Sequence, residues 1–391
     1  MKPGYKQTEV GIIPENWDVC TLGALGPFSK GQGIRKSEAT SGEIPCIRYG
    51  EIYTHHSDVV RFYNSHISAA VALTSKHLRK GDLLFAGSGE TKEEIGKCVA
   101  FVDDEDVYAG GDIVVLSPNA GSSVFFGYLL NAPPVANQKA SKGQGDAVVH
   151  ISSRALASVT IPFPPPPEQR AIATALSDVD GLLGGLDRLI AKKGDLKQAA
   201  MQQLLTGQTR LPGFHGEWEV KRLGEHIVRL KKTTRPSSAG RAEGAYPFFT
   251  NTTKPVDRFL DEADFDTEAI IANTGGEAYF NYYNGSFAAM SDCFVFETKI
   301  VTRFLYYFLK SVERAVNDNG FTGSGIKHLD KKYFYQMEVR CPAELPEQTA
   351  IASVLTEMDA ELAALEQRLE KTRALKQAMM QELLTGRTRL V

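Results

Sequence analysis

Residues 221–254 hold the side chains best suited to bind a polyanion. The stretch carries eight Lys or Arg and two Glu. Lys231, Lys232, Arg235 and Arg241 lie among Ser, Gly and Pro residues, where no apolar periodicity would bury them. Such side chains suit contact with the phosphates of a nucleic acid, which would make the affinity salt-dependent. A solvated basic loop without a partner is the alternative.

Polar and aromatic residues further along could contact bases. Hydroxyl, amide and ammonium groups pair with base edges, and tyrosine rings can stack on bases, although the tyrosines would equally suit ordinary strand packing. These candidates are Thr250, Asn251, Thr252, Thr253 and Lys254, then Tyr279 and Tyr282 near a glycine turn, and Thr322, Ser324 and Lys327 in a later turn.

The first half of the chain offers a second set of candidates in glycine-punctuated loops and turns. They are Lys30, Gln32, Arg35 and Lys36; Tyr53 and His55 after an expected strand; Ser88, Thr91 and Lys92 in one turn; and Lys139, Lys142 and Gln144 in another.

The sequence lacks the motifs of a DNA methyltransferase, a nuclease, an ATP-binding loop and a metal site. The string nearest a DNA methyltransferase motif, at 131–135, has neither the polar residue directly before its two prolines nor the aromatic after them. Asp82 with Glu90 and Lys92 only loosely resembles a nuclease site, and no phosphate-binding GxxxxGK[ST] loop occurs. His55 and His56 are adjacent without further ligands, so we expect a surface turn there, and no catalytic residue, metal or cofactor in this chain.

Composition indicates a globular protein of two or three domains. The 391 residues are 42% hydrophobic and 23% charged, with a net charge of −3. The five cysteines form no CxxC pair, and no apolar run reaches the ~18 residues of a membrane span. We expect a cytoplasmic protein whose DNA-binding surface, if present, consists of local basic patches.

The elements that must position these candidates are repeated. Residues 167–211 and 346–390 align without a gap, with 24 of 45 positions identical at an offset of 179 residues. Each copy opens with Pro-Glu-Gln and has Leu-Leu-Thr-Gly near its end, at 204–207 and 383–386. Because the intervening stretches differ, the pattern predicts two different modules on one duplicated frame.

The repeated segment predicts a long helix with a coiled-coil seam. Proline suits the first helical turn, and Gly207 and Gly386 suit the C-terminal caps. Apolar residues spaced alternately by four and three form the seam. They are Ile172, Leu176, Val179, Leu183, Leu186 and Ile190 in the first copy, and Ile351, Leu355, Met358, Leu362, Leu365 and Leu369 in the second.

Chain connectivity favours antiparallel pairing of the two helices. Roughly 38 residues at ~1.5 Å each make a rod of ~57 Å. The second module must connect the end of the first helix to the start of the second, and antiparallel pairing makes those points neighbours. Two helices buried separately in two cores are the alternative.

The intervening modules share a skeleton. Each begins with Trp, an acid and Val, followed by Leu-Gly, at Trp17 and again at Trp218. Short β-rich runs broken by Gly, Pro and Asn, with apolar helices at 125–130 and 304–309, predict mixed α/β modules. We expect a first module at 1–165, a helix at 166–211, a second module at 212–344 and a helix at 345–391.

This organisation resembles the specificity subunit of type I restriction–modification systems over essentially the whole chain. The resemblance rests on IPENW at 13–17, the paired PEQ…AIA…L helix entries and the paired LKQA-MQ-LLTG helix ends. It implies two target recognition domains that bind double-stranded DNA and that are joined by an antiparallel coiled coil. It also implies two methyltransferase (modification) subunits, which bind S-adenosylmethionine, and restriction subunits, which use ATP and Mg²⁺.

The implied function is recognition of a split DNA target without catalysis. Two unlike modules would read two unlike half-sites, so the target would not be palindromic, and the helices would set the spacer between them. A coiled-coil adaptor that does not touch DNA is the alternative. An enzyme with its own nuclease or methyltransferase activity is disfavoured because its motifs are missing.

Overall fold

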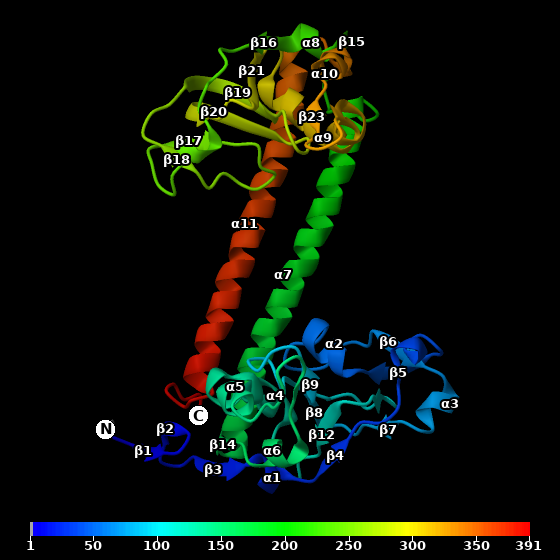
Figure 1. The fold of residues 1–391 in the computed structure, drawn as a ribbon, viewed down its shortest axis with the longest axis vertical. Helices are drawn as coiled ribbons and strands as arrows, with labels where there is room; N and C mark the ends of the chain where they lie inside the picture. Colours follow the sequence, from blue (N-terminus) through cyan, green and yellow to red (C-terminus); the bar gives the residue numbers. More distant parts are fainter. Residues whose placement is uncertain (1–2) are drawn as a thin grey trace. The chain divides into compact units, whose positions relative to one another are not determined.

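The computed structural model describes residues 3–391, which pack as two compact units (Figure 1). The first unit runs to Gly185 and resumes at Leu369; the second is Leu186–Arg368. Each unit contains one module and half of each long helix, because each module packs against the helix ends that adjoin it. No helix within residues 3–391 is long and apolar enough to cross a membrane.

The first module is built on two four-stranded sheets. One has the order β10-β8-β12-β4 and is entirely antiparallel, with Val115 opposite Leu84. The other has the order β6-β5-β11-β7, in which β5 and β11 are parallel. The strands are β4 Phe28–Lys30, β5 Ile44–Ile47, β6 Ser65–Ile67, β7 Lys76–His77, β8 Leu83–Ala86, β10 Cys98–Ala100, β11 Tyr108–Ala109 and β12 Ile113–Leu116.

Short ladders and helices complete this module. The paired strands are β1 Tyr5–Thr8 with β2 Gly11–Pro14, β3 Asp18–Thr21 with β14 Thr160–Phe163, and β9 Ser88–Gly89 with β13 Val149–His150. The helices are α1 Leu22–Leu25, α2 Tyr49–Thr54, α3 Ala69–Ala72, α4 Ser123–Asn131, α5 Pro133–Ala140 and α6 Ser153–Ala157, with a 3₁₀ turn at Lys36–Glu38.

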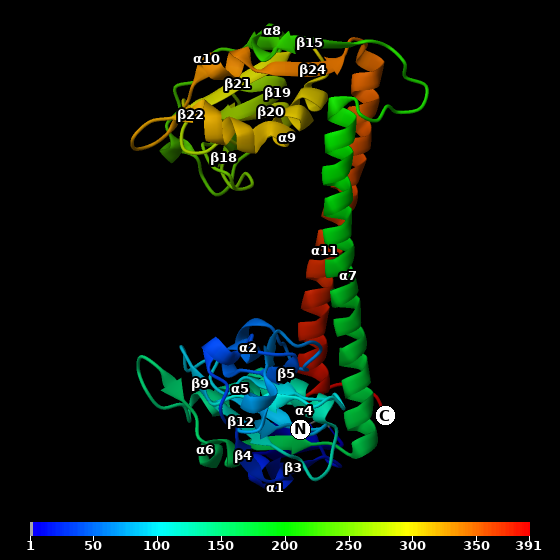
Figure 2. The same cartoon turned by 90° about the vertical axis from the view of Figure 1, so that its right-hand side faces the viewer.

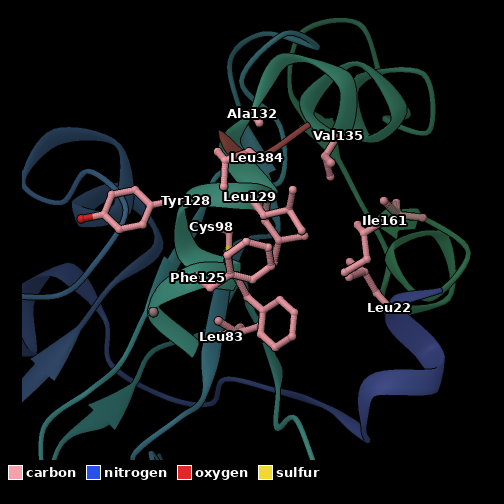
Figure 3. Close-up of a cluster of buried hydrophobic side chains, with 14 of the residues drawn as sticks. Leu22, Leu83, Cys98, Phe125, Tyr128, Leu129, Ala132, Val135, Ile161 and Leu384 are labelled. Atoms are coloured by element: carbon pink, nitrogen blue, oxygen red, sulfur yellow. The ribbon is translucent and has the colours of Figure 1, made fainter. Parts of the chain in front are cut away.

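The core of the first unit joins the module to the helix ends. Figure 3 shows Leu83, Cys98 and Phe125 packed together, with Leu384 from the C-terminal segment nearby. Ile172 and Leu176, near the start of the first long helix, belong to the same buried cluster. Apolar burial at ~25 cal/mol per Å² therefore holds the module and the helix ends together.

The second module is built on one six-stranded sheet of order β16-β21-β19-β20-β17-β18. Its helix α9, Thr302–Gly320, packs on β19, β20 and β21 (Figure 2). The strands are β16 Ile227–Arg229, β17 Tyr246–Phe249, β18 Phe259–Leu260, β19 Phe265–Asn273, β20 Phe280–Ala289 and β21 Cys293–Thr298. Two ladders, β15 Trp218–Arg222 with β24 Glu338–Pro342 and β22 Phe321–Thr322 with β23 His328–Leu329, accompany α8 Leu223–His226, α10 Lys331–Gln336 and a 3₁₀ turn at Ser237–Ala239.

The two long helices are α7, Pro166–Thr206, and α11, Leu345–Leu383. In the first unit the start of α7 packs with the end of α11, and in the second unit the end of α7 packs with the start of α11. The pairing is therefore antiparallel, as predicted, and all twelve seam residues are buried or half-buried. Gly207 and Gly386 follow the helices at φ of 71° and 70°, the left-handed conformation that favours glycine.

The Glu of each Pro-Glu-Gln motif binds an arginine that follows the end of the other helix. Arg210 donates from Nε and Nη2 to Glu347 at 2.5 and 2.6 Å. Arg389 binds Glu168 in the same bidentate way, its Nη2 lying 2.7 Å from Oε2, and Trp17 Nε1 donates to that carboxylate at 2.7 Å. The same arginine–glutamate pair, formed by the two ends of the repeated segment, therefore occurs once in each unit.

The Gln of each motif binds the helix that packs beside it. Gln169 accepts from Ser122 N at 2.9 Å before α4, and Gln348 accepts from Val301 N at 3.0 Å before α9. The mixed α/β fold with an internal repeat and paired helices is thus confirmed.

Candidate nucleic-acid interface

A basic hollow of about 240 Å³ lies on the second module. Arg229, Lys231, Lys232 and Lys331 line it, with Asp292 as the acidic group of its lining. Four cations around one hollow suit an anionic ligand such as a backbone phosphate.

Local structure positions these four cations. Arg229 ends the edge strand β16, and its guanidinium lies 4.9 Å from the ring centroid of Tyr335. Lys331 opens α10 and lies 5.5 Å from the ring of Phe294. Cation–π contacts hold a charge in place without neutralising it, so both cations remain available to an anion.

Lys231 and Lys232 stand in a loop that is anchored at its far end. Thr233 Oγ1 donates to Ala289 O at 2.7 Å, and Ser291 N donates to the carbonyl of Arg235 at 2.9 Å. Both lysines are exposed, and across residues 3–391 neither has an ion-pair partner. The loop therefore presents two unpaired ammonium groups on a fixed backbone.

Arg235 and Arg241 differ from these lysines. Arg235 is half-buried, its Nε lies 2.7 Å from Asp264, and this hydrogen bond raises the pKa of the guanidinium. Arg241 is exposed and pairs with Asp261 at 2.9 Å. Arg235 is therefore held within the module by Asp264, which leaves it less available to a phosphate than the sequence predicts, while Arg241 stays a candidate.

The polar run at 250–254 contains residues that bond within the module and residues that are exposed to solvent. Asn251 Oδ1 accepts from Thr274 N at 3.2 Å, and Asn251 N lies 3.2 Å from the sulfur of Met290. Thr250 and Thr252 are half-buried, whereas Thr253 and Lys254 are exposed. Thr253 and Lys254 are thus the members of this run most accessible to DNA, together with the exposed turn that holds Thr322, Ser324 and Lys327.

The two tyrosines of this module are engaged within it. Tyr282 donates to Glu268 at 2.6 Å, and the guanidinium of Arg303 covers its ring at 4.3 Å. Lys310 covers the ring of Tyr279 at 4.3 Å. These contacts with α9 favour strand packing over stacking on bases.

The first module presents a different hollow of about 420 Å³. Tyr49, Tyr53, Glu90 and Glu94 line it. Tyr53 donates to the carbonyl of Ser88 at 3.2 Å, and burial followed by the charge of Glu94 raises the pKa of Tyr53 to about 12. This hollow is acidic and aromatic where that of the second module is basic.

Most of the candidate DNA-contacting residues of the first module are exposed on its surface. Lys30, Gln32, Arg35 and Lys36 are exposed in and after β4, as are His55, Thr91, Lys92 and Gln144, while Lys142 is half-buried. His55 pairs with Thr54, its Nδ1 lying 2.6 Å from the hydroxyl.

Two first-module candidates are buried and are withdrawn. Lys139 is 1% exposed, donates to Gly96 O at 2.5 Å, and its pKa is lowered to about 8 by burial. Ser88 is 4% exposed and bonds His150 at 2.9 Å. The expectation of turns is wrong for these two residues, because Lys139 belongs to α5 and Ser88 to β9, and both side chains are buried.

The His-His turn is also buried in part. His56 and Asp58 are 5% and 6% exposed, and neither ring nitrogen of His56 has a hydrogen-bond partner among residues 3–391. The expected surface turn therefore holds only for His55 and Ser57. Sequence reasoning missed the contact that buries Asp58, because its partner, Lys376, lies 318 residues away.

The protein thus has two modules on a duplicated pair of helices, and the modules present different polar surfaces, one basic and one acidic. This arrangement is that of a binding protein with two separate binding modules. The family model described as type I restriction modification DNA specificity domain matches residues 14–190 and 215–373. The chain belongs to this family, which confirms the resemblance seen in the sequence. DNA target recognition is the general role of these subunits, and catalysis is carried by other subunits.

Curated relatives match nearly the whole chain or part of it. The type I restriction enzyme MjaX specificity subunit of Methanocaldococcus jannaschii is 24% identical over 422 residues, covering 99% of this chain and 97% of its own. The EcoDI specificity subunit of Escherichia coli is 30% identical over 170 residues, covering 43% of this chain and 37% of its own.

Solved structures share the fold. The type I restriction–modification S subunit from M. genitalium superposes with a TM-score of 0.66 at 17% identity, covering 98% of this chain and 99% of that one. The HsdS subunit from Thermoanaerobacter tengcongensis gives a TM-score of 0.50 at 20% identity, covering 96% and 98%.

Proposed function

We propose that this chain reads a split, non-palindromic DNA target, with one half-site for each module. The observation that carries the proposal is the contrast between the two hollows on a duplicated frame. A basic hollow suits phosphates, whereas Glu90 and Glu94 in the acidic hollow could accept hydrogen bonds from exposed amino groups such as cytosine N4. Modules that differ this much should select different bases.

The paired helices would set the number of unread base pairs between the half-sites. A 41-residue helix such as α7 is ~60 Å long at ~1.5 Å per residue. One turn of B-DNA is ~34–36 Å, so a helix pair of this length suits a spacer that separates two major-groove contacts by one to two turns.

The outer faces of the helices are proposed to dock two methyltransferase subunits, and through them the restriction subunits. In the second unit Leu189 and Leu196 are 38% and 48% exposed and lie seven residues apart on α7, so they share a face. Glu361 pairs with Lys193 at 2.7 Å, while Gln367 is exposed. S-adenosylmethionine, ATP and Mg²⁺ would be bound by these partners.

Module exchange tests the split-target proposal. Replacing residues 212–344 with the corresponding module of another family member, in complex with the modification subunits, should change one half of the methylated site. The other half and the spacer should stay the same. A change in both halves, or in neither, would contradict the assignment of one half-site to each module.

The alternative is an adaptor that does not touch DNA. A gel-shift assay of the complex at two salt concentrations distinguishes it from the proposed function. Recognition predicts binding that weakens steeply as salt rises, whereas an adaptor predicts no shift at either salt concentration.

A further inference from the structure

One ammonium group joins the first module to both long helices. Lys376 of α11 lies 2.8 Å from Asp58 of the module and 2.8 Å from Asp180 of α7. Tyr128 of α4 donates to the same Asp180 at 2.6 Å, and Figure 3 shows its hydroxyl directed away from the apolar cluster. Only 14% of the Lys376 side chain is exposed, so this pair is weakly screened by water.

The second unit contains the same contact between the two long helices, without an acid from its module. Lys197, Asp359 and Tyr307 stand 179 residues from Lys376, Asp180 and Tyr128. Lys197 pairs with Asp359, and Tyr307 donates to Asp359 at 2.7 Å. Within residues 3–391 no acid of the second module pairs with Lys197. The contact to Asp58 is therefore an addition specific to the first module.

Asp58 is firmly held on its own side of this contact. Asn131 Nδ2 donates to its Oδ1 at 3.0 Å, and Ala100 N donates to its carbonyl at 3.0 Å. A nearby cation, Arg61, lies 3.5 Å from Asp180. The segment at 58–61 is thus tied to the sheet, to α4 and to both helices at once.

The tied segment continues directly into the candidate DNA-contacting hollow. Helix α2 precedes it, and Tyr53 of α2 lines that hollow. Lys97 Nζ donates to the carbonyl of His56 at 2.7 Å, which fixes the chain between α2 and Asp58. A displacement of Asp58 would therefore move the wall of the hollow.

We propose that Lys376 is a positioning residue, which through Asp58 fixes the reading surface of the first module relative to the helix pair. The inference rests on the proposed function and deepens it. We call the Lys376–Asp58 contact the lock, and we expect the protein to need it to distinguish DNA with the correct spacer from DNA with an altered spacer. The second module lacks the equivalent contact, so the corresponding lysine, Lys197, has no such role.

The lock is tested first without DNA, by hydrogen exchange of the full chain with its modification subunits. Asp58→Asn preserves the shape of the side chain and an acceptor for Asn131 but removes the charge that Lys376 binds. Amides of 49–62 should exchange roughly tenfold faster in this variant, and those of α4 should not change. Unchanged exchange at 49–62 would overturn the lock.

Spacer discrimination is the second readout, on the target determined from methylated DNA. Asp58→Asn and Lys376→Met should each reduce roughly tenfold the preference for the native spacer over one altered by a base pair. Lys197→Met, the control from the second unit, should keep that preference. Equal losses in all three variants would overturn the proposal. If the wild-type complex binds no DNA, the proposed function fails, and the exchange experiment still decides whether the lock exists.

Discussion

At the residue scale, Lys231 and Lys232 are the two exposed lysines that line the basic hollow of the second module. Among residues 3–391 neither has an ion-pair partner. Removing the ammonium group that binds one phosphate should reduce the slope of log K against log salt by ~0.9. The variant K231A/K232A should therefore weaken binding and lower that slope by about 2.

Lys299→Ala is the matched control for this prediction. Lys299 is an exposed lysine of the same module outside the hollow. Titration of labelled DNA with the complex at four salt concentrations measures both slopes. Equal slopes for the double variant and the wild type would remove these lysines from the interface.

A second residue-scale prediction concerns pH. Burial lowers the pKa of His56, opposed in part by the charge of Glu51, and within the described part of the chain both ring nitrogens lack hydrogen-bond partners. The unfolded chain thus takes up a proton near pH 6.5 that the folded chain resists. The stability contributed by neutral His56 is complete above that pH and is lost as pH falls toward the lower folded pKa.

Thermal unfolding at pH 7.5 and pH 5.5 checks the role of His56. His56→Phe should reduce the loss of stability between these two values, whereas His55→Gln, a change at the exposed neighbour, should leave the loss as in wild type. A wild-type pH dependence in His56→Phe would show that other groups control it.

At the element scale, the repeated helix ends are stabilised by arginine–glutamate pairs. The side chain of Glu168 is 1% exposed and binds both Arg389 and Trp17. Removing one partner of a buried pair leaves an uncompensated charge and costs ~3–5 kcal/mol. We expect Arg389→Ala to lower the free energy of unfolding by about 3 kcal/mol, since Trp17 still donates to Glu168.

Arg387→Ala, two residues away, is the control. Arg387 is exposed and lies 3.9 Å from Glu382, and an exposed pair of this kind contributes ~0–1 kcal/mol. Urea denaturation of both variants measures the difference. Equal losses would mean that Glu168 does not depend on Arg389.

The long helices could be predicted from sequence because their determinants are local. The 3.5-residue spacing from Ile172 to Ile190 specifies one apolar face, and Gly207 specifies a left-handed cap. Both features lie within a few residues of the structure that they determine.

The candidate surface could be predicted only in part, because exposure depends on distant contacts. Lys139 lies in a sequence typical of a turn, yet it belongs to α5 and its side chain packs against Gly96. Arg235 lies in a sequence typical of an exposed loop, yet it is held by Asp264, which is 29 residues away in the sequence. Lys331, beyond the basic stretch, reaches the hollow only because α10 packs near β21.

At the scale of the whole molecule, the repeated segment forms the structural frame, whereas the modules between the repeats carry the surfaces proposed to bind DNA. The repeated segment retains the groups that hold helices and modules together, including Glu168 and Glu347. The modules share a skeleton but differ in the polar residues that line their hollows. Recognition can then change within a module without altering the frame.

We propose that two unlike modules on one duplicated frame read two unlike half-sites, and a genome-wide methylation map of cells that express this chain with its modification subunits is the decisive test. We expect one methylated target with two short defined parts, different in sequence and separated by a constant number of undefined bases. A continuous target, or two identical halves in inverted orientation, would contradict it.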